Sequence, residues 1–249
     1  MRYELMLPHH IRLAIAQNWP VVLPLGVLEY HGEHLAVGMD TLVVIKILEL
    51  LETNYKMVIL PPFYYGASSH AVAPPESNGS VQVNAENLLP FGKDLFRALL
   101  RIGFRNIHGV IHHQTENFAA GMPTDLAFKL AGRQAVFEFL ERTQGEGFWG
   151  NAKMADYYGQ HQEGDNPFNW IEIHPLMSPE ITKQYPFDHA GKGETSLMMA
   201  LCPDAVDMSK LNSTPWYTRN AFDASAELGR AGCGLILKHM RACLGLVED

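Results

Sequence analysis

Five side chains able to bind metals or move protons follow one apolar stretch of the sequence. The segment VLEYHGEHLAVGMDT contains Glu29, His31, Glu33, His34 and Asp40, directly after the apolar run VVLPLG. In an extended chain the side chains alternate between two sides, so Glu29 and His31 point the same way. Mixed carboxylate and imidazole donors suit Zn, Mn or Fe better than Ca or Mg, which prefer oxygen ligands. The segment therefore predicts a divalent metal site.

Asp40 stands where the helix predicted from TLVVIKILELLETN begins. A carboxylate there is able to bridge two cations while the helix N-terminus stabilises its negative charge. Because no cysteine lies nearby, such a site would activate water or polarise a carbonyl group rather than serve a structural role. The competing interpretation is that Glu29 and His31 are ordinary loop residues and that Asp40 only caps the helix.

A second polar stretch, HHQTEN, follows the third apolar run of the chain. If the strand alternation continues through it, His112, Gln114 and Glu116 share one side and His113 points the other way. The alternative is that the histidines are packed and hydrogen-bonded at a strand end, and that Glu116 belongs only to a turn.

A third polar stretch, DHAGKGETS, places an Asp-His pair before a glycine-rich turn that opens a helix. His189 is a candidate general acid or base, since the pKa of an unperturbed histidine lies near 6.5. Glu194 would lie in the first helical turn, where the helix dipole favours a carboxylate. The alternative is a simple helix start that is capped by Thr195 or Ser196.

Apolar runs and helical periodicity alternate along the chain. The predicted strands are almost wholly apolar, as in a sheet covered on both faces: residues 21–28, 56–62 and 106–113. Helical spacing follows each strand: residues 41–54, from about residue 85 onward, and 123–143, and it returns in GETSLMMAL and ASAELGRAGCGLILKHMRACLGL. This order predicts an α/β fold, a three-layer α/β/α sandwich with a mainly parallel sheet, in one domain over residues 1–249. Sites in such sheets form beyond the carboxyl ends of the strands, where the polar stretches lie.

Composition narrows the class of protein. The chain has 249 residues, 47% of them hydrophobic, and a net charge of −8, which argues against a nucleic-acid-binding surface. No stretch approaches the ~20 apolar residues of a membrane span, and the N-terminus lacks the pattern of a signal peptide. The three cysteines are widely spaced, which fits a reducing compartment. We expect a cytoplasmic protein that binds neither nucleic acid nor membrane.

Residues 144–187 show no clear periodicity and are rich in Gly, Asn, Gln, Tyr and Trp. A structureless stretch of that length inside a compact domain is usually functional. Its aromatic residues are candidates for a lid over a flat substrate: Trp149, Tyr157, Tyr158, Trp170 and Tyr185. We take Trp170 and Tyr185, with Tyr65 from FYYGASSH, as candidate substrate-binding residues. The alternative is that these aromatics pack internally or form a subunit interface.

Taken together, the motifs resemble the creatininase (creatinine amidohydrolase) family. PLGVLEYHGEHLAVGMD is similar to the family pattern P-x-G-x-x-E-x-H-G-x-H-L-x-x-x-x-D, and LPPFYYGASSH is similar to P-P-x-x-Y-G-x-S-x-x-H. HHQTEN stands at the place of N-G-H-x-x-N, and DHAGKGETSLMMALCPDAV is similar to H-A-G-x-x-E-T-S followed by a helix and P-D. The four pieces occur in the family order from Pro24 to about Val206.

The resemblance implies a set of metal ligands. By position these are Glu29, His31 and Asp40, with Asp40 bridging two ions, and Glu116 as a further carboxylate ligand. The family histidine of N-G-H is replaced by Gln114, whose amide oxygen is a weaker ligand than imidazole for zinc-like ions. On this alignment the site that includes position 114 is weakened, and the site that includes Glu116 is complete. The alternative is that His112 or His113 compensates for Gln114, although strand alternation disfavours His113.

The resemblance also implies an activity and its partners. It implies His189 as the residue that handles protons near the substrate, with Glu194 as support or acid/base and Glu116 close to the reaction. The expected protein is a metal-dependent amidohydrolase that cleaves a C–N bond of a small, often cyclic amide such as creatinine. It would use one or two divalent ions per chain, zinc or manganese with iron also compatible, and would form a homo-oligomer, a hexamer in the family.

Two other functions stay open at the level of sequence. One is a hydrolase similar to the formamido-pyrimidine deformylases that share the family fold. The other is a non-catalytic metal- or ligand-binding descendant, which lost one metal with the change to Gln114.

Overall fold

The protein is built on a parallel sheet with helices on both faces. The computed structural model describes residues 1–154 and 166–247, and its strands are β1 (Val21–Leu25), β2 (Val58–Ile59), β3 (Ile107–Ile111) and β4 (Ile171–Pro175). The strands pair in the order β2-β1-β3-β4, and each pair is parallel. The predicted α/β/α sandwich with a mainly parallel sheet is confirmed.

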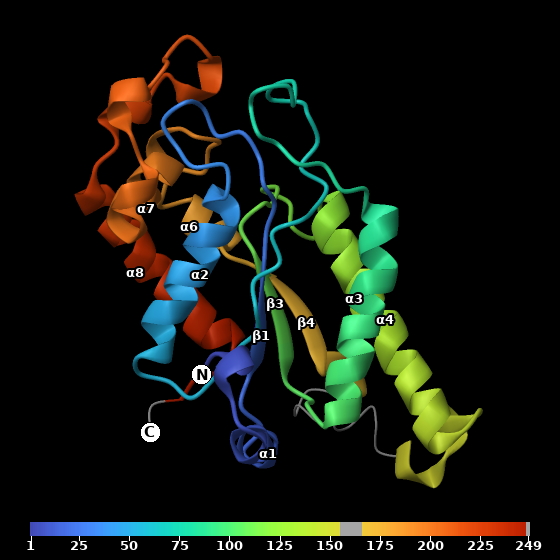
Figure 1. Ribbon diagram of the computed structural model, residues 1–249. Coiled ribbons are helices and arrows are strands. Elements are labelled where there is room, and N and C mark those ends of the chain that lie inside the picture. Colours follow the sequence, from blue (N-terminus) through green and yellow to red (C-terminus); the bar gives the residue numbers. More distant parts are fainter. Residues whose placement is uncertain (155–165, 248–249) are drawn as a thin grey trace.

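The helices form the two outer layers. They are α1 (Pro8–Ala16), α2 (Met39–Glu52), α3 (Ala85–Ile102), α4 (Pro123–Gln144), α6 (Pro179–Thr182), α7 (Lys192–Leu201) and α8 (Ala226–Cys243). Figure 1 shows α3 and α4 on one side of the sheet and α2, α7 and α8 on the other. None of the helices in the described parts of the chain is both long and apolar enough to cross a membrane.

Alternate residues of β1 face the two layers. Val22 belongs to the core between the sheet and α2, α7 and α8, whereas Val21 and Leu23 belong to the core on the α3 and α4 side. All five residues of β1 and all five of β3 are buried. Double-sided burial explains why these strands read as continuous apolar runs rather than as an apolar–polar alternation.

The predicted strands are longer than the observed ones, and β4 was not predicted. The second strand shrinks to β2 because two prolines follow it and remove the backbone donors that a ladder needs. Strand β4 lies in the segment 144–187 that lacked periodicity, yet its sequence IEIHP does alternate. It ends the sheet and is buried less completely than β1 and β3, so polar residues are tolerated on one side.

Helix α7 is fixed against α8 by a close approach of their backbones. A Cβ atom added at Gly229 of α8 would overlap the carbonyl oxygen of Ser196 and lie 2.8 Å from the Cβ of Ala200. Gly234, one and a half turns further along α8, has nothing within 4 Å of its Cβ position and is exposed. The first glycine is therefore required by packing and the second is not.

This contrast predicts opposite effects for two glycine substitutions in one helix. Gly229→Ala should lower the free energy of unfolding by roughly 1–3 kcal/mol, because α8 must move away from α7. Gly234→Ala should raise it by up to about 1 kcal/mol, because alanine favours the helix over glycine at an open position. Urea unfolding followed by circular dichroism measures both. Equal effects of the two substitutions would contradict the packing described here.

Candidate metal centre

A large pocket lies beyond the carboxyl ends of the strands. Its volume is about 810 Å³, and it collects residues from the segments after β1 and β3 and from the start of α7. A Cβ atom at Gly26, just after β1, would overlap the Thr41 hydroxyl of α2. This close approach holds the segment after β1 against the first turn of α2. The polar stretches from three parts of the chain therefore meet at the predicted edge of the sheet.

One group of candidate ligands consists of Glu29, Asp40 and His113. The Nδ1 atom of His113 lies 3.3 Å from Glu29 Oε2 and 3.5 Å from Asp40 Oδ2. All three side chains are buried, and their donor atoms lie within 4.8 Å of one another. Two carboxylates and an imidazole that converge in this way suit zinc, manganese or iron.

A second group consists of His31, Asp40 and Glu194, also buried and within 4.8 Å of one another. The Nε2 atom of His31 lies 3.7 Å from Asp40 Oδ1 and 3.5 Å from Glu194 Oε2. The other ring nitrogen of His31, Nδ1, donates to the Glu29 backbone carbonyl at 3.0 Å. That hydrogen bond commits Nδ1–H, so Nε2 faces the two carboxylates and is the nitrogen that would bind a metal.

Asp40 belongs to both groups, and each of its oxygens faces one of them. Its side chain is buried in the first turn of α2, where the helix dipole favours a negative charge. Its Oδ2 atom has no hydrogen-bond partner among the described residues. A buried carboxylate oxygen without a donor fits a divalent cation, and a carboxylate shared by two donor groups fits a pair of them.

Glu194 is held at the pocket by the turn that opens α7. Its Oε2 accepts a hydrogen bond from the backbone N–H of Ala190 at 2.6 Å, and its Oε1 lies 3.1 Å from His112 Nε2. Asp188 accepts hydrogen bonds from the backbone N–H groups of Gly193 at 2.7 Å and Glu194 at 3.1 Å, which caps the helix. These bonds aim the Glu194 side chain at His31 rather than at solvent.

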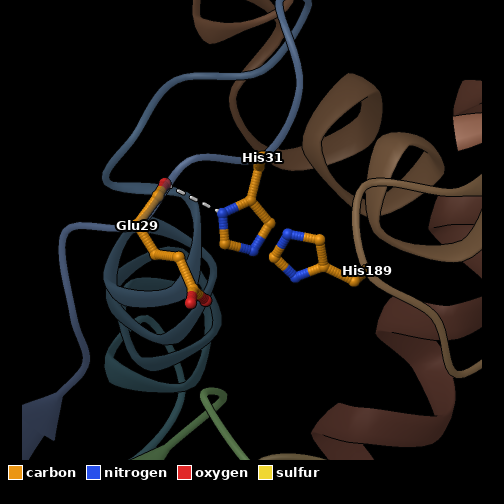
Figure 2. A group of neighbouring side chains, drawn as sticks. All are labelled: Glu29, His31 and His189. Atoms are coloured by element: carbon orange, nitrogen blue, oxygen red, sulfur yellow. Dashed lines mark hydrogen bonds between the residues drawn. The ribbon is translucent and has the colours of Figure 1, made fainter. Parts of the chain in front are cut away.

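His189 lies over His31 at the wall of the pocket (Figure 2). The two ring centroids are 4.2 Å apart with an angle of 30° between the planes. The Nε2 atom of His189 lies 3.0 Å from the Tyr30 backbone carbonyl and donates to it, so the lone pair is on Nδ1. Glu29, His31 and His189 also present donor atoms within 4.8 Å of one another. His189 therefore lies beside the candidate ligands.

The charges in the pocket shift one another's pKa values. Burial by itself lowers the pKa of His113, but the adjacent Asp40 and Glu29 carboxylates, with their negative charges, outweigh burial and raise the pKa to about 10. Burial likewise opposes the carboxylates of Asp40 and Glu194, but the positive charge of His31 holds the pKa of both below the usual range. The metal-free pocket thus carries charged carboxylates and a protonated His113.

Two of the expected ligands line the pocket but lie outside its donor groups. The Gln114 side chain forms two hydrogen bonds with the backbone of Met177, at 2.8 and 3.0 Å. Glu116 is exposed at the pocket rim, where its carboxylate lies 3.2 Å from the Thr115 hydroxyl. His113 joins Glu29 and Asp40 where Gln114 was expected, and Glu194 joins His31 and Asp40 where Glu116 was expected. β3 ends at Ile111, so the strand alternation assumed for the residues that follow does not extend over them.

The three predicted substrate-binding aromatics lie outside the pocket lining. Tyr185 is buried in the core, where its hydroxyl donates to the Gly193 carbonyl at 2.7 Å. Trp170 precedes β4, with the Arg105 guanidinium over its ring. Tyr65 is exposed and packs edge-on against Phe63.

Among the remaining lid candidates, only Trp149 lies within the described residues, and it is outside the pocket lining. Trp149 contacts Phe148 and Phe168 rather than the pocket. Tyr157 and Tyr158 fall outside the described residues. The aromatic residues of the described chain that line the pocket are Phe187, at the end of segment 144–187, and Trp216 and Tyr217, in a segment that gave no prediction.

Comparison with known proteins finds the same family in sequence and in structure. The profile of the family described as "Creatininase: Creatinine amidohydrolase" matches residues 5–240. A creatinine amidohydrolase from Pseudomonas putida is 23% identical over 205 residues, which are 82% of this chain and 72% of that protein.

Solved structures agree with the sequence match. A tryptophan-to-phenylalanine mutant of creatininase superposes with a TM-score of 0.73 at 18% identity, covering 98% of this chain and 96% of the other. A glutamate-to-glutamine mutant complexed with creatine gives 0.70 at 20% identity over the same shares. Other matching creatininase structures are described as a Mn form and a Zn-Zn type. At these identities the structures demonstrate a shared fold.

The raised pKa of His113 predicts how the stability of the metal-free protein depends on pH. The unfolded histidine titrates near 6.5, so its ion pairs stabilise the fold fully below that pH and are lost as pH rises through about 10. Between pH 7 and pH 9.5, wild type in chelator should lose roughly 1–3 kcal/mol more unfolding free energy than His113→Gln does. Urea unfolding at several pH values measures this.

The exposed His70 supplies the control, because His70→Gln removes a histidine that stands in solvent and should keep the wild-type pH dependence. An unchanged slope in His113→Gln would show that the ion pairs of His113 do not form in solution.

Proposed function

The chain belongs to the creatininase family, and from this premise we propose that it is a metal-dependent amidohydrolase that cleaves a C–N bond of a small cyclic amide, with creatinine as the first candidate substrate. The observation that carries the proposal is the pair of buried donor groups that share Asp40. A single acidic side chain between two sets of ligands is the arrangement that two-metal hydrolases require.

The proposed centre holds two divalent ions. Glu29, Asp40 and His113 would hold one, and His31, Asp40 and Glu194 would hold the other. Zinc or manganese suits both sets, and related creatininase structures are described with these metals. Bound divalent ions supply two kinds of chemistry, polarisation of a carbonyl group and a lowered pKa of water.

The protein residues then position the substrate and move protons. The lone pair of His189 Nδ1 is free, because its Nε2–H is committed to the Tyr30 carbonyl. We assign to Nδ1 the acceptance of a proton from the attacking water and the transfer of that proton to the departing nitrogen. His112 donates to Glu194 and holds it in place, so Glu194 acts as a ligand rather than as the mobile acid.

The pocket walls supply the binding surface. Phe187, Trp216 and Tyr217 line the pocket, and the rings of Tyr217 and His189 lie 5.4 Å apart, nearly perpendicular. A flat amide ring suits a wall of this kind. The exposed Glu116 would contact the substrate or the solvent at the rim rather than a metal.

The sequence left two alternative functions open, and the same substrate assays distinguish them. A formamido-pyrimidine deformylase-like hydrolase would use the same ligands on a different amide. The case for a non-catalytic descendant rested on Gln114, and it weakens because His113 completes the donor set without the glutamine.

The assignment of His113 predicts unequal effects of two neighbouring substitutions on metal content. His113→Ala should bind about one zinc ion fewer per chain than wild type, because it removes one of three donors of a buried site. Gln114→Ala should keep the wild-type content, because its amide bonds only to Met177. Equilibrium dialysis followed by elemental analysis measures both. A loss in Gln114→Ala with full binding in His113→Ala would reverse the assignment.

The assignment of His189 predicts a loss of turnover without a loss of metal. His189→Gln should lower kcat for the hydrolysed amide by ~10²–10⁴-fold at unchanged metal content, as expected for removal of a general acid. Creatinine, other cyclic amides and formamido compounds, assayed with and without chelator, identify the substrate class. Full zinc loading of wild type with no hydrolysis of any of these amides would favour the binding-protein alternative.

A further inference from the structure

A second cluster of metal-binding side chains lies away from the pocket, on β3 and β4. It consists of His108, Glu172 and His174, whose donor atoms lie within 4.8 Å of one another. The register pairs His108 with Glu172, and His174 lies two residues further along β4 on the same face. Four residues of chain, about 13 Å in extended form, separate His108 from His112, so this cluster is distinct from the pocket.

The hydrogen bonds around His108 leave a lone pair that points into the cluster. Asn106 donates its Nδ2 to the Asn18 carbonyl at 3.0 Å, which turns its Oδ1 towards His108. His108 Nε2 donates to that oxygen at 2.7 Å. The lone pair of His108 is therefore on Nδ1, only 2.9 Å from His174 Nε2. An imidazole that is oriented by a carbonyl on its far nitrogen is the usual form of a histidine ligand.

Two imidazole nitrogens at this distance need a proton or a cation between them. Glu172 Oε2 lies 3.5 Å from the same His174 nitrogen and adds a negative charge. Burial lowers the pKa of His108 to about 3 and of His174 to about 4, so both rings are neutral at neutral pH. Neutral imidazoles bind a metal without first losing a proton.

The cluster is partly open to solvent at the edge of the sheet. Glu172 and His174 belong to β4, which is the last strand of the sheet order. The Glu172 side chain is 38% exposed and that of His174 is 13% exposed, whereas His108 is buried. The set therefore combines one buried donor, one partly buried donor and one exposed donor, on which solvent ligands would complete the coordination.

We propose that His108, Glu172 and His174 form an additional site for a divalent transition metal of the zinc class, completed by solvent, which ties the end strand β4 to β3. Two imidazoles and one carboxylate match the preferences of zinc and exclude calcium and magnesium as its natural occupants. Because the ion would bind both strands in the folded chain only, it would stabilise the fold by mass action. The proposal does not depend on the function of the pocket.

The test counts zinc ions per chain in the full-length protein by equilibrium dialysis and elemental analysis. His174→Gln and Glu172→Ala should each bind one ion fewer than wild type, because each removes a donor from a three-residue set. His239→Gln is the matched control: His239 faces the same strand end from α8, where its Nε2 lies 3.2 Å from the Pro175 carbonyl. This variant should keep the wild-type count.

The difference in zinc content between wild type and the variants does not depend on whether the pocket binds zinc. If the pocket binds no zinc, wild type should bind one ion and His174→Gln none, so the difference persists. Glu172→Ala changes an exposed side chain. It therefore provides the test if His174→Gln does not fold. Equal counts in wild type and Glu172→Ala, with both proteins folded by circular dichroism, would overturn the proposal and leave a hydrogen-bonded histidine pair.

Discussion

The negative charge of Asp40, buried at the start of α2, is the constraint on which the candidate site depends. A carboxylate removed from water is costly unless cations or donors compensate it. The fold brings His31 to one of its oxygens and His113 to the other, and it adds the positive end of a helix. The negative charges that favour protonation of the histidines would also attract divalent ions. Protons and metal ions would therefore compete for the same side chains.

The sheet is what makes this compensation possible. β1 and β3 are adjacent and parallel, so the segments that follow them leave the sheet side by side. Gly26 lets the first of these segments approach α2, and Asp188 caps the start of α7 so that Glu194 points inwards. The candidate site at this edge thus depends on short connections after the strands, two of which are held by these close contacts, on an apolar scaffold.

Side chains alternate between the two faces of each strand, and this alternation also places the members of the cluster on one face of β3 and β4. The apolar faces of both strands are buried against the helices, and β4, as the last strand, admits polar residues that a central strand would exclude. His108 is the exception, a polar side chain on a fully buried strand. Both ring nitrogens of His108 have hydrogen-bond partners, Asn106 and His174, so the two histidines and Asn106 form one connected network.

The sequence alone determined the fold class, the edge of the sheet that carries the site, the family, and the placement of Glu29, His31, Asp40 and His189 around one pocket. These features depend on local periodicity and on spacing within single segments, which the sequence displays directly. Only the tertiary structure decided that His113 and Glu194, rather than Gln114 and Glu116, face Asp40, and that Tyr65, Trp170 and Tyr185 lie elsewhere. The reason is that strand alternation stops at Ile111, and beyond it the direction of a side chain is set by partners distant in sequence, such as Met177 for Gln114 and His112 for Glu194.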